Sequence, residues 1–144
     1  MGILDIFKKG FKPITDRDPL PLDEFPTRAI ILKEKDFEKA ARKYPFLLLE
    51  FHADWCAPCK HMKPKIKWLA KELSGKVVVG TVDVERQRGL ASRFRVRGIP
   101  RMILLHYGDN VESWMGFRDI TKLSKDLLRY HRQYEEAMSE SDAK

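Results

Sequence analysis

The chain of 144 residues contains two cysteines, and both lie in the segment Trp55-Cys56-Ala57-Pro58-Cys59-Lys60. Two thiols at this spacing suit either reversible disulfide formation or metal binding, whereas a disulfide-stapled scaffold carries several cysteines at scattered positions. A bond between Cys56 and Cys59 would close too short a loop to stabilise the fold much. The pair is therefore a candidate reactive site.

The elements that must position the pair are a buried strand and a helix. The nearly continuous apolar run 46–51 predicts a central strand covered on both faces, and residues 56–73 predict a helix that begins at Cys56. A cysteine at a helix N-terminus faces unpaired N–H groups and the positive end of the helix dipole, which favour the nucleophilic thiolate. One turn brings Cys59 within bonding reach of Cys56. Pro58 fits the first turn, where its missing N–H costs little.

Alternating helix and strand patterns continue on both sides of this unit. Strands are predicted at 29–32, 77–84, 102–106 and 111–115, and helices at 36–44, 88–94 and 120–138. Turn residues at 107–110 predict an antiparallel hairpin between the last two strands. The order βαβαβαββα predicts an α/β fold with a mixed central sheet between helices, over a domain at 28–138. Residues 139–144 are predicted to be a disordered polar tail.

Residues 1–27 differ from this domain and predict an irregular N-terminal extension. Four of the eight prolines lie there, at positions 13, 19, 21 and 26, and they disfavour regular structure. Within it, residues 3–11 place apolar side chains on one helical face among lysines. This segment is a candidate for weak docking to a membrane surface or a partner, although so short a helix is marginal alone and such a piece can also pack on its own domain.

The net charge of +7 is carried by the domain, because the N-terminal extension holds five acidic and four basic residues. Such a domain could attract acidic proteins, anionic lipid or nucleic acid, or simply present a solvated surface. Nucleic-acid binding is not expected, since no recognised module is found. The N-terminus shows no secretory signal and no run reaches the roughly 18 apolar residues of a membrane span, so a cytoplasmic location is predicted.

The hexapeptide at 55–60 resembles the Trp-Cys-Gly-Pro-Cys-Lys signature of the thioredoxin family. The resemblance extends over about residues 28 to 136 without a gap. Its further landmarks are Gly98-Ile99-Pro100, similar to the family's segment with a cis-proline, Pro64 in the active-site helix, and the late glycines Gly108 and Gly116. The resemblance implies a thioredoxin fold and a redox dithiol that needs no cofactor.

The same resemblance implies a reaction and the residues around it. Cys56 would attack a protein disulfide, Cys59 would resolve the mixed disulfide, and a thioredoxin-reductase-like electron donor would restore the dithiol. This assigns the chain to electron transport and cell redox homeostasis. The residues expected to contact substrate are Trp55, Ala57, Pro58, Ile99, Pro100 and Arg101.

Glu50 interrupts the apolar run of the predicted central strand. Burial is expected to raise the pKa of its carboxyl, because desolvation disfavours the charged form. The family usually has Asp here as proton acceptor for the second cysteine, so the resemblance implies that Glu50 relays a proton from Cys59. Thr81 stands where the family often has a lysine beside this acid. The alternative is a strand-edge glutamate that reaches solvent.

Three other interpretations of the sequence stay open. With His52 and His61, the cysteines could form a Cys2His2 zinc site, and a charged His52 could instead favour the Cys56 thiolate. The fold could be a binding module that recruits a partner through its groove and basic surface. The dithiol could also work in the opposite direction, as a disulfide oxidase or isomerase, although those activities belong to oxidising compartments.

Overall fold

A computed structural model describes residues 26–116 and 119–142. A sheet of five strands lies at its centre, in the order β1-β3-β2-β4-β5. The strands are β1 (Ile30–Ile31), β2 (Phe46–His52), β3 (Val78–Asp83), β4 (Arg101–His106) and β5 (Asp109–Met115). β3 is parallel to β1 and β2, whereas β4 pairs antiparallel with β2 and β5. The predicted mixed sheet is confirmed.

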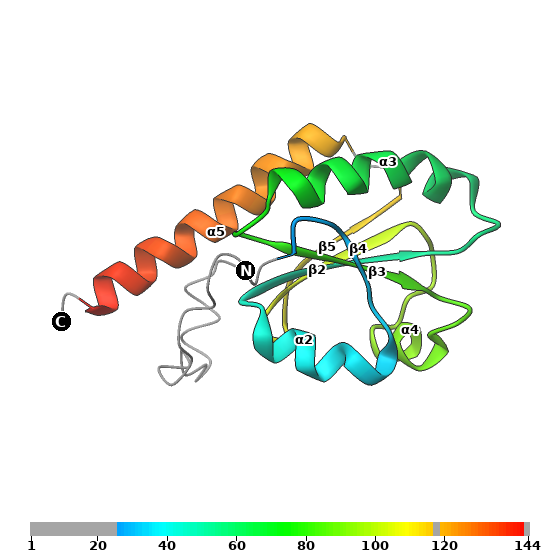
Figure 1. Cartoon of the computed structure of the whole chain (residues 1–144), viewed down its shortest axis with the longest axis horizontal. Helices are drawn as coiled ribbons and strands as arrows, with labels where there is room; N and C mark the ends of the chain where they lie inside the picture. The colour runs from blue at the N-terminus through cyan, green and yellow to red at the C-terminus, as the bar shows by residue number, and fades with distance from the viewer. Residues whose placement is uncertain (1–25, 117–118, 143–144) are drawn as a thin grey trace.

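Helices cover both faces of this sheet (Figure 1). The helical elements are the 3-10 turn η2 (Glu34–Asp36), α2 (Phe37–Lys43), α3 (Ala57–Glu72), α4 (Arg88–Arg93) and α5 (Ile120–Asp142). α3 and α5 lie on one face of the sheet, and α2 and α4 lie on the other (Figure 1). This is the sandwich that the alternating sequence patterns predict.

Strand β2 is buried because its two faces enter two different cores. Phe46 and Leu48 point into the core beneath α3 and α5, and both are fully buried. Leu47, Leu49 and Phe51 point into the core beneath α2 and α4. Successive side chains of a strand alternate between faces, so an unbroken apolar run is what a doubly covered strand requires. β2 thereby fixes the position of the segment that follows it, which contains both cysteines.

The predicted hairpin between β4 and β5 is confirmed, with a tighter turn than the sequence suggested. Only Tyr107 and Gly108 connect the strands, and both have positive φ, at 46° and 90°. Two central residues with positive φ make a turn whose twist matches that of the flanking strands. A register shift at Leu104 and Leu105 then places one extra residue in β5, as in a β-bulge.

Two predictions concern the ends of the chain. The disordered tail predicted at 139–144 is wrong for its first part, because α5 runs to Asp142. An existing helix needs no new nucleus, and each residue added to it forms one further hydrogen bond, so polar residues can extend it. The N-terminal predictions, including the docking segment 3–11, fall almost entirely on residues 1–25, outside the described residues. No helix in the described ranges has the length and apolarity to cross a membrane.

Candidate active site

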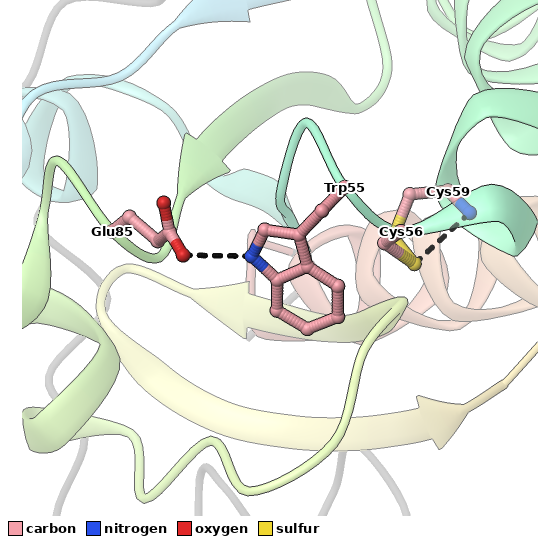
Figure 2. The surroundings of a disulfide bond; sticks show 4 residues. All are labelled: Trp55, Cys56, Cys59 and Glu85. Atoms are coloured by element: carbon pink, nitrogen blue, oxygen red, sulfur yellow. Dashed lines mark hydrogen bonds between the residues drawn. A yellow bond between two sulfur atoms is a disulfide. The ribbon is translucent and has the colours of Figure 1, made fainter.

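Cys56 occupies the N-cap of α3, directly before the first helical residue Ala57. Its backbone is extended, with φ −86° and ψ 108°, and its Sγ accepts a hydrogen bond from the Cys59 amide at 3.2 Å. The two sulfurs form a disulfide, with the Cα atoms 5.2 Å apart (Figure 2). Thus a backbone N–H that the helix leaves unpaired points at the first sulfur, as the sequence predicts.

The local sequence explains why the pair stands at this point. β2 ends at His52, and a turn follows in which the Cys56 amide donates to the carbonyl of Ala53 at 3.1 Å. Pro58 occupies the first turn of α3, where no N–H is required. The buried strand and the helix therefore hold the cysteines between them.

Both cysteines lie in a small apolar cluster at the edge of the sheet. Cys56 and Cys59 are 4% and 5% exposed and pack with Ala53, and Val84 and Ile99 lie against this cluster. The two sulfurs are thus largely covered by neighbouring residues.

The predicted landmark at residues 98–100 lies next to the dithiol, although it is distant in sequence. Ile99 packs against the cysteine cluster, and the Ile99–Pro100 peptide bond is cis. Pro100 is buried, and its carbonyl accepts a hydrogen bond from the Gly116 amide at 2.8 Å. The fold thus places Ile99 next to the first turn of α3. The contact of these residues with substrate stays a prediction.

Trp55 has a partner that the sequence analysis missed. Its side chain is 66% exposed, and its Nε1 donates to a carboxylate oxygen of Glu85 at 2.7 Å (Figure 2). Glu85 follows β3, whose carboxyl end lies beside that of its parallel neighbour β2. The sequence held one signal for this contact. Glu85 is an acidic residue just after β3, and β3 lies next to β2, the strand that precedes the dithiol. The hydrogen bond holds an exposed aromatic ring beside the cysteines.

Glu50 lies on β2 with its side chain on the face covered by α3, like Phe46 and Leu48. It is 4% exposed, and burial raises its pKa to about 7. Its neighbours in the sheet are Thr81 on β3 and Met102 on β4. The carboxyl is therefore buried beneath the active-site helix, and the alternative of a glutamate reaching solvent at a strand edge is wrong. Its role as a proton relay stays a prediction.

His52 does not supply the charge that the sequence suggested. Its ring is half-buried, and burial lowers its pKa, although Asp83 and Asp54 act in the opposite direction. Burial thus disfavours the charged imidazole that would stabilise a thiolate. Within the described ranges, no group of three or more His, Cys, Asp or Glu side chains is placed to hold a metal ion.

The arginines near Pro100 have different surroundings. Arg101 donates from its guanidinium to Ser113 on β5 at 3.4 Å. Arg93 on α4 forms an ion pair with Glu38 on α2, with N and O 2.5 Å apart, and its guanidinium lies over the ring of Phe37. Arg97 remains exposed. The contact of Arg101 with substrate stays a prediction.

Comparison with known proteins assigns the family. The thioredoxin family model matches residues 28–129. A thioredoxin domain-containing protein of Theileria parva is 38% identical over 104 residues, which are 69% of this chain and 47% of the relative. A thioredoxin of Buchnera aphidicola is 34% identical over 103 residues, covering 70% of this chain and 94% of the relative. The chain belongs to the thioredoxin family.

Solved structures agree with this assignment. A mutant thioredoxin from Halobacterium salinarum superimposes with a TM-score of 0.69 at 28% sequence identity, covering 74% of this chain and 93% of that one. The fold is therefore the thioredoxin fold, and the Cys56–Cys59 pair forms a CxxC motif of the kind that this family carries. The chain spans less than half of the Theileria relative.

Proposed function

We propose that this protein reduces disulfides in other proteins by dithiol exchange. The observation that carries the proposal is the N-cap position of Cys56, whose sulfur accepts the Cys59 N–H at 3.2 Å. Such a donor stabilises negative charge on sulfur, and the thiolate is the attacking species. Trp55 and the Ile99–Pro100 segment supply the surface that a partner contacts.

The reaction proceeds by two sulfur displacements. The Cys56 thiolate attacks one sulfur of the substrate disulfide, forms a mixed disulfide, and displaces the other sulfur as a thiolate. The Cys59 thiolate then attacks Cys56, forms the Cys56–Cys59 disulfide and displaces the second substrate thiolate. Two electrons pass from the dithiol to the substrate, and an external dithiol donor of the thioredoxin-reductase type returns them.

Glu50 serves this cycle as the proton acceptor for Cys59. Cys59 must lose a proton before it attacks, and a base with a pKa near the working pH is the most effective acceptor. The buried Glu50 carboxyl, with its pKa raised to about 7, meets that requirement. The Glu50 side chain lies on the face of the sheet that α3 covers, and Cys59 belongs to the first turn of that helix. A carboxyl with this pKa is partly ionised at pH 7, and it becomes neutral when it accepts the proton.

A reducing compartment such as the cytoplasm is the setting we propose. A protein with two cysteines, both in the dithiol, is better suited to such a compartment than to one in which scattered disulfides form. The opposite direction, oxidation or isomerisation of disulfides, is distinguished by the reduction potential. A value near about −270 mV marks a reductase, whereas a value near about −120 mV marks a strong oxidant.

The proposal is tested by insulin reduction with dithiothreitol as electron source, followed as turbidity, and by equilibration of the dithiol with glutathione. The wild-type protein is expected to accelerate precipitation, and Cys56→Ser is expected to abolish the acceleration. Equal activity of Cys56→Ser would contradict the proposal. A potential close to that of strong oxidants would reverse its direction.

A further inference from the structure

The outer side of α3 carries a stripe of lysines that starts next to the dithiol. Lys60, Lys63, Lys67 and Lys71 follow at steps of three and four residues, and all four are exposed. Residues at this spacing lie on one side of a helix. α3 as a whole holds five lysines and one glutamate, a net charge of +4.

α5 carries a second stripe of the same kind. Lys122, Lys125, Arg129 and Arg132 also follow at steps of three and four, and all four are exposed. Residues 120–132 hold four basic residues and one acid, a net charge of +3. α3 and α5 pack on the same side of the sheet (Figure 1). We call the eight side chains of the two stripes the basic face.

The charges of the basic face are largely available to a partner. Within the described residues, Arg129 is the member that lies in an ion pair, with Asp126 at 3.5 Å. The positive charge of α5 is confined to its first part, because residues 133–142 hold four acidic residues and no basic one.

The α3 part of the basic face begins next to the reactive sulfurs. Cys56 caps α3, Cys59 is in its first turn, and Lys60 follows immediately. Lys71 lies roughly 16 Å further along the helix at 1.5 Å per residue. A partner that covers the lysines of α3 therefore lies against the end of the helix where the disulfide exchange takes place.

We propose that the basic face recruits disulfide-containing proteins whose surface beside the disulfide is acidic. This inference rests on the proposed reductase function and adds its substrate class. Acidic protein, anionic lipid and nucleic acid would all be attracted by this charge, but of the three only a protein brings a disulfide to the sulfurs at the end of α3. Charge of one sign around a site raises association rates by about 10- to 1,000-fold, and salt screens the effect.

The test uses two versions of one disulfide-bonded peptide, which differ only in a tail of four glutamates or four lysines. Their reduction by the fully reduced protein is followed in single-turnover experiments at increasing ionic strength. The glutamate-tailed peptide is expected to react about tenfold faster at low salt, and the difference is expected to vanish near 0.5 M salt, where charges are screened within about 5 Å.

A pair of variants with the same change in charge locates the effect. The triple substitution Lys63→Glu, Lys67→Glu and Lys71→Glu is expected to remove or reverse the preference. The control Lys35→Glu, Lys39→Glu and Arg42→Glu changes exposed residues of η2 and α2, across the sheet from the basic face (Figure 1), and is expected to keep it. Should the first variant fold poorly, glutamine at the same three lysines is expected to weaken the preference.

The outcomes separate this inference from the function on which it rests. Reduction of neither peptide by the wild-type protein would overturn both. Equal reduction of the two peptides, or the same loss of preference in the control variant, would overturn the inference and leave the reductase intact. Equal peptide rates combined with binding to phosphatidylserine vesicles that the α3 substitutions abolish would assign the basic face to a membrane instead.

Discussion

The Cys59 amide donates to Sγ of Cys56 at 3.2 Å, so the residue that stabilises the first sulfur also carries the second. The same turn thus performs two tasks, polarising the nucleophile and holding the thiol that later displaces the substrate from it. Because Cys56 is at the N-cap, the helix dipole adds to the effect of this hydrogen bond.

The two thiols of the reduced protein are therefore expected to differ in reactivity. Cys56 receives the N–H donor of the first turn, so more of it should be present as thiolate. Iodoacetamide at neutral pH should alkylate Cys56 several-fold faster than Cys59, as measured by peptide mass spectrometry after short exposures. Equal labelling, or faster labelling of Cys59, would show that the N-cap does not activate Cys56.

Glu50 should make the oxidised protein less stable as the pH rises. Burial raises its pKa from 4.5 to about 7, so the folded state binds the proton more tightly than the unfolded state does. The stabilisation by the neutral carboxyl is complete below pH 4.5 and is lost as the pH rises to 7, by at most about 3 kcal/mol. Urea unfolding of Glu50→Gln across this range should show a flatter pH dependence than that of the wild type.

The kinetic role of Glu50 is a separate prediction. If Glu50 accepts the proton of Cys59, Glu50→Gln should slow release of the substrate from the mixed disulfide about 10- to 100-fold and leave the initial attack unchanged. Quenched-flow experiments separate these two steps. A variant that resolves the mixed disulfide at the wild-type rate would exclude the proton relay.

His106 should produce the opposite pH dependence. It is fully buried, and burial lowers its pKa from 6.5 to about 4, so the unfolded state binds the proton more tightly. Its contribution to stability is complete above pH 6.5 and is lost as the pH falls to 4, by up to about 3 kcal/mol. His106→Phe should remove this loss in acid unfolding curves.

Phenylalanine at position 106 removes the titrating ring without leaving the Pro45 carbonyl unpaired. Nδ1 of His106 donates to the Pro45 carbonyl at 2.9 Å, because a carbonyl oxygen only accepts. The Tyr107 amide also donates to this carbonyl, at 3.0 Å. The carbonyl therefore keeps a partner in the variant. An unchanged acid dependence in His106→Phe would assign the acid sensitivity to other groups.

The hydrogen bond between Trp55 and Glu85 should matter for binding more than for stability. Both side chains are at the surface, where such a bond contributes at most about 1 kcal/mol. Glu85→Ala should therefore leave the melting temperature nearly unchanged, while the freed ring raises KM for protein substrates several-fold. A Trp55 ring with unchanged fluorescence anisotropy and an unchanged KM would contradict this role.

The sequence was most informative where one local pattern determined the structure. The apolar run of β2 and the helical pattern of residues 56–73 together placed the dithiol at a helix N-terminus. The two-residue hairpin turn at Tyr107 and Gly108 was harder to place, since four consecutive residues there have turn chemistry.

Features that depend on packing between distant segments could not be predicted in this way. The bond from Glu85 to Trp55 joins the ends of two neighbouring strands, and the pKa of His52 is lowered because the fold buries part of its ring. The basic face needs two helices that are far apart in sequence to pack on the same face of the sheet, which depends on the order of the strands.

The most direct test of this mechanism is to trap the mixed disulfide. Reduced Cys59→Ser and Cys56→Ser proteins are each incubated with an oxidised protein substrate and separated by non-reducing electrophoresis. Cys59→Ser should accumulate a one-to-one adduct through Cys56 that dithiothreitol releases, because the thiol that resolves it is missing, and Cys56→Ser should form none. An adduct formed equally by Cys56→Ser would contradict the assignment of Cys56 as the attacking sulfur.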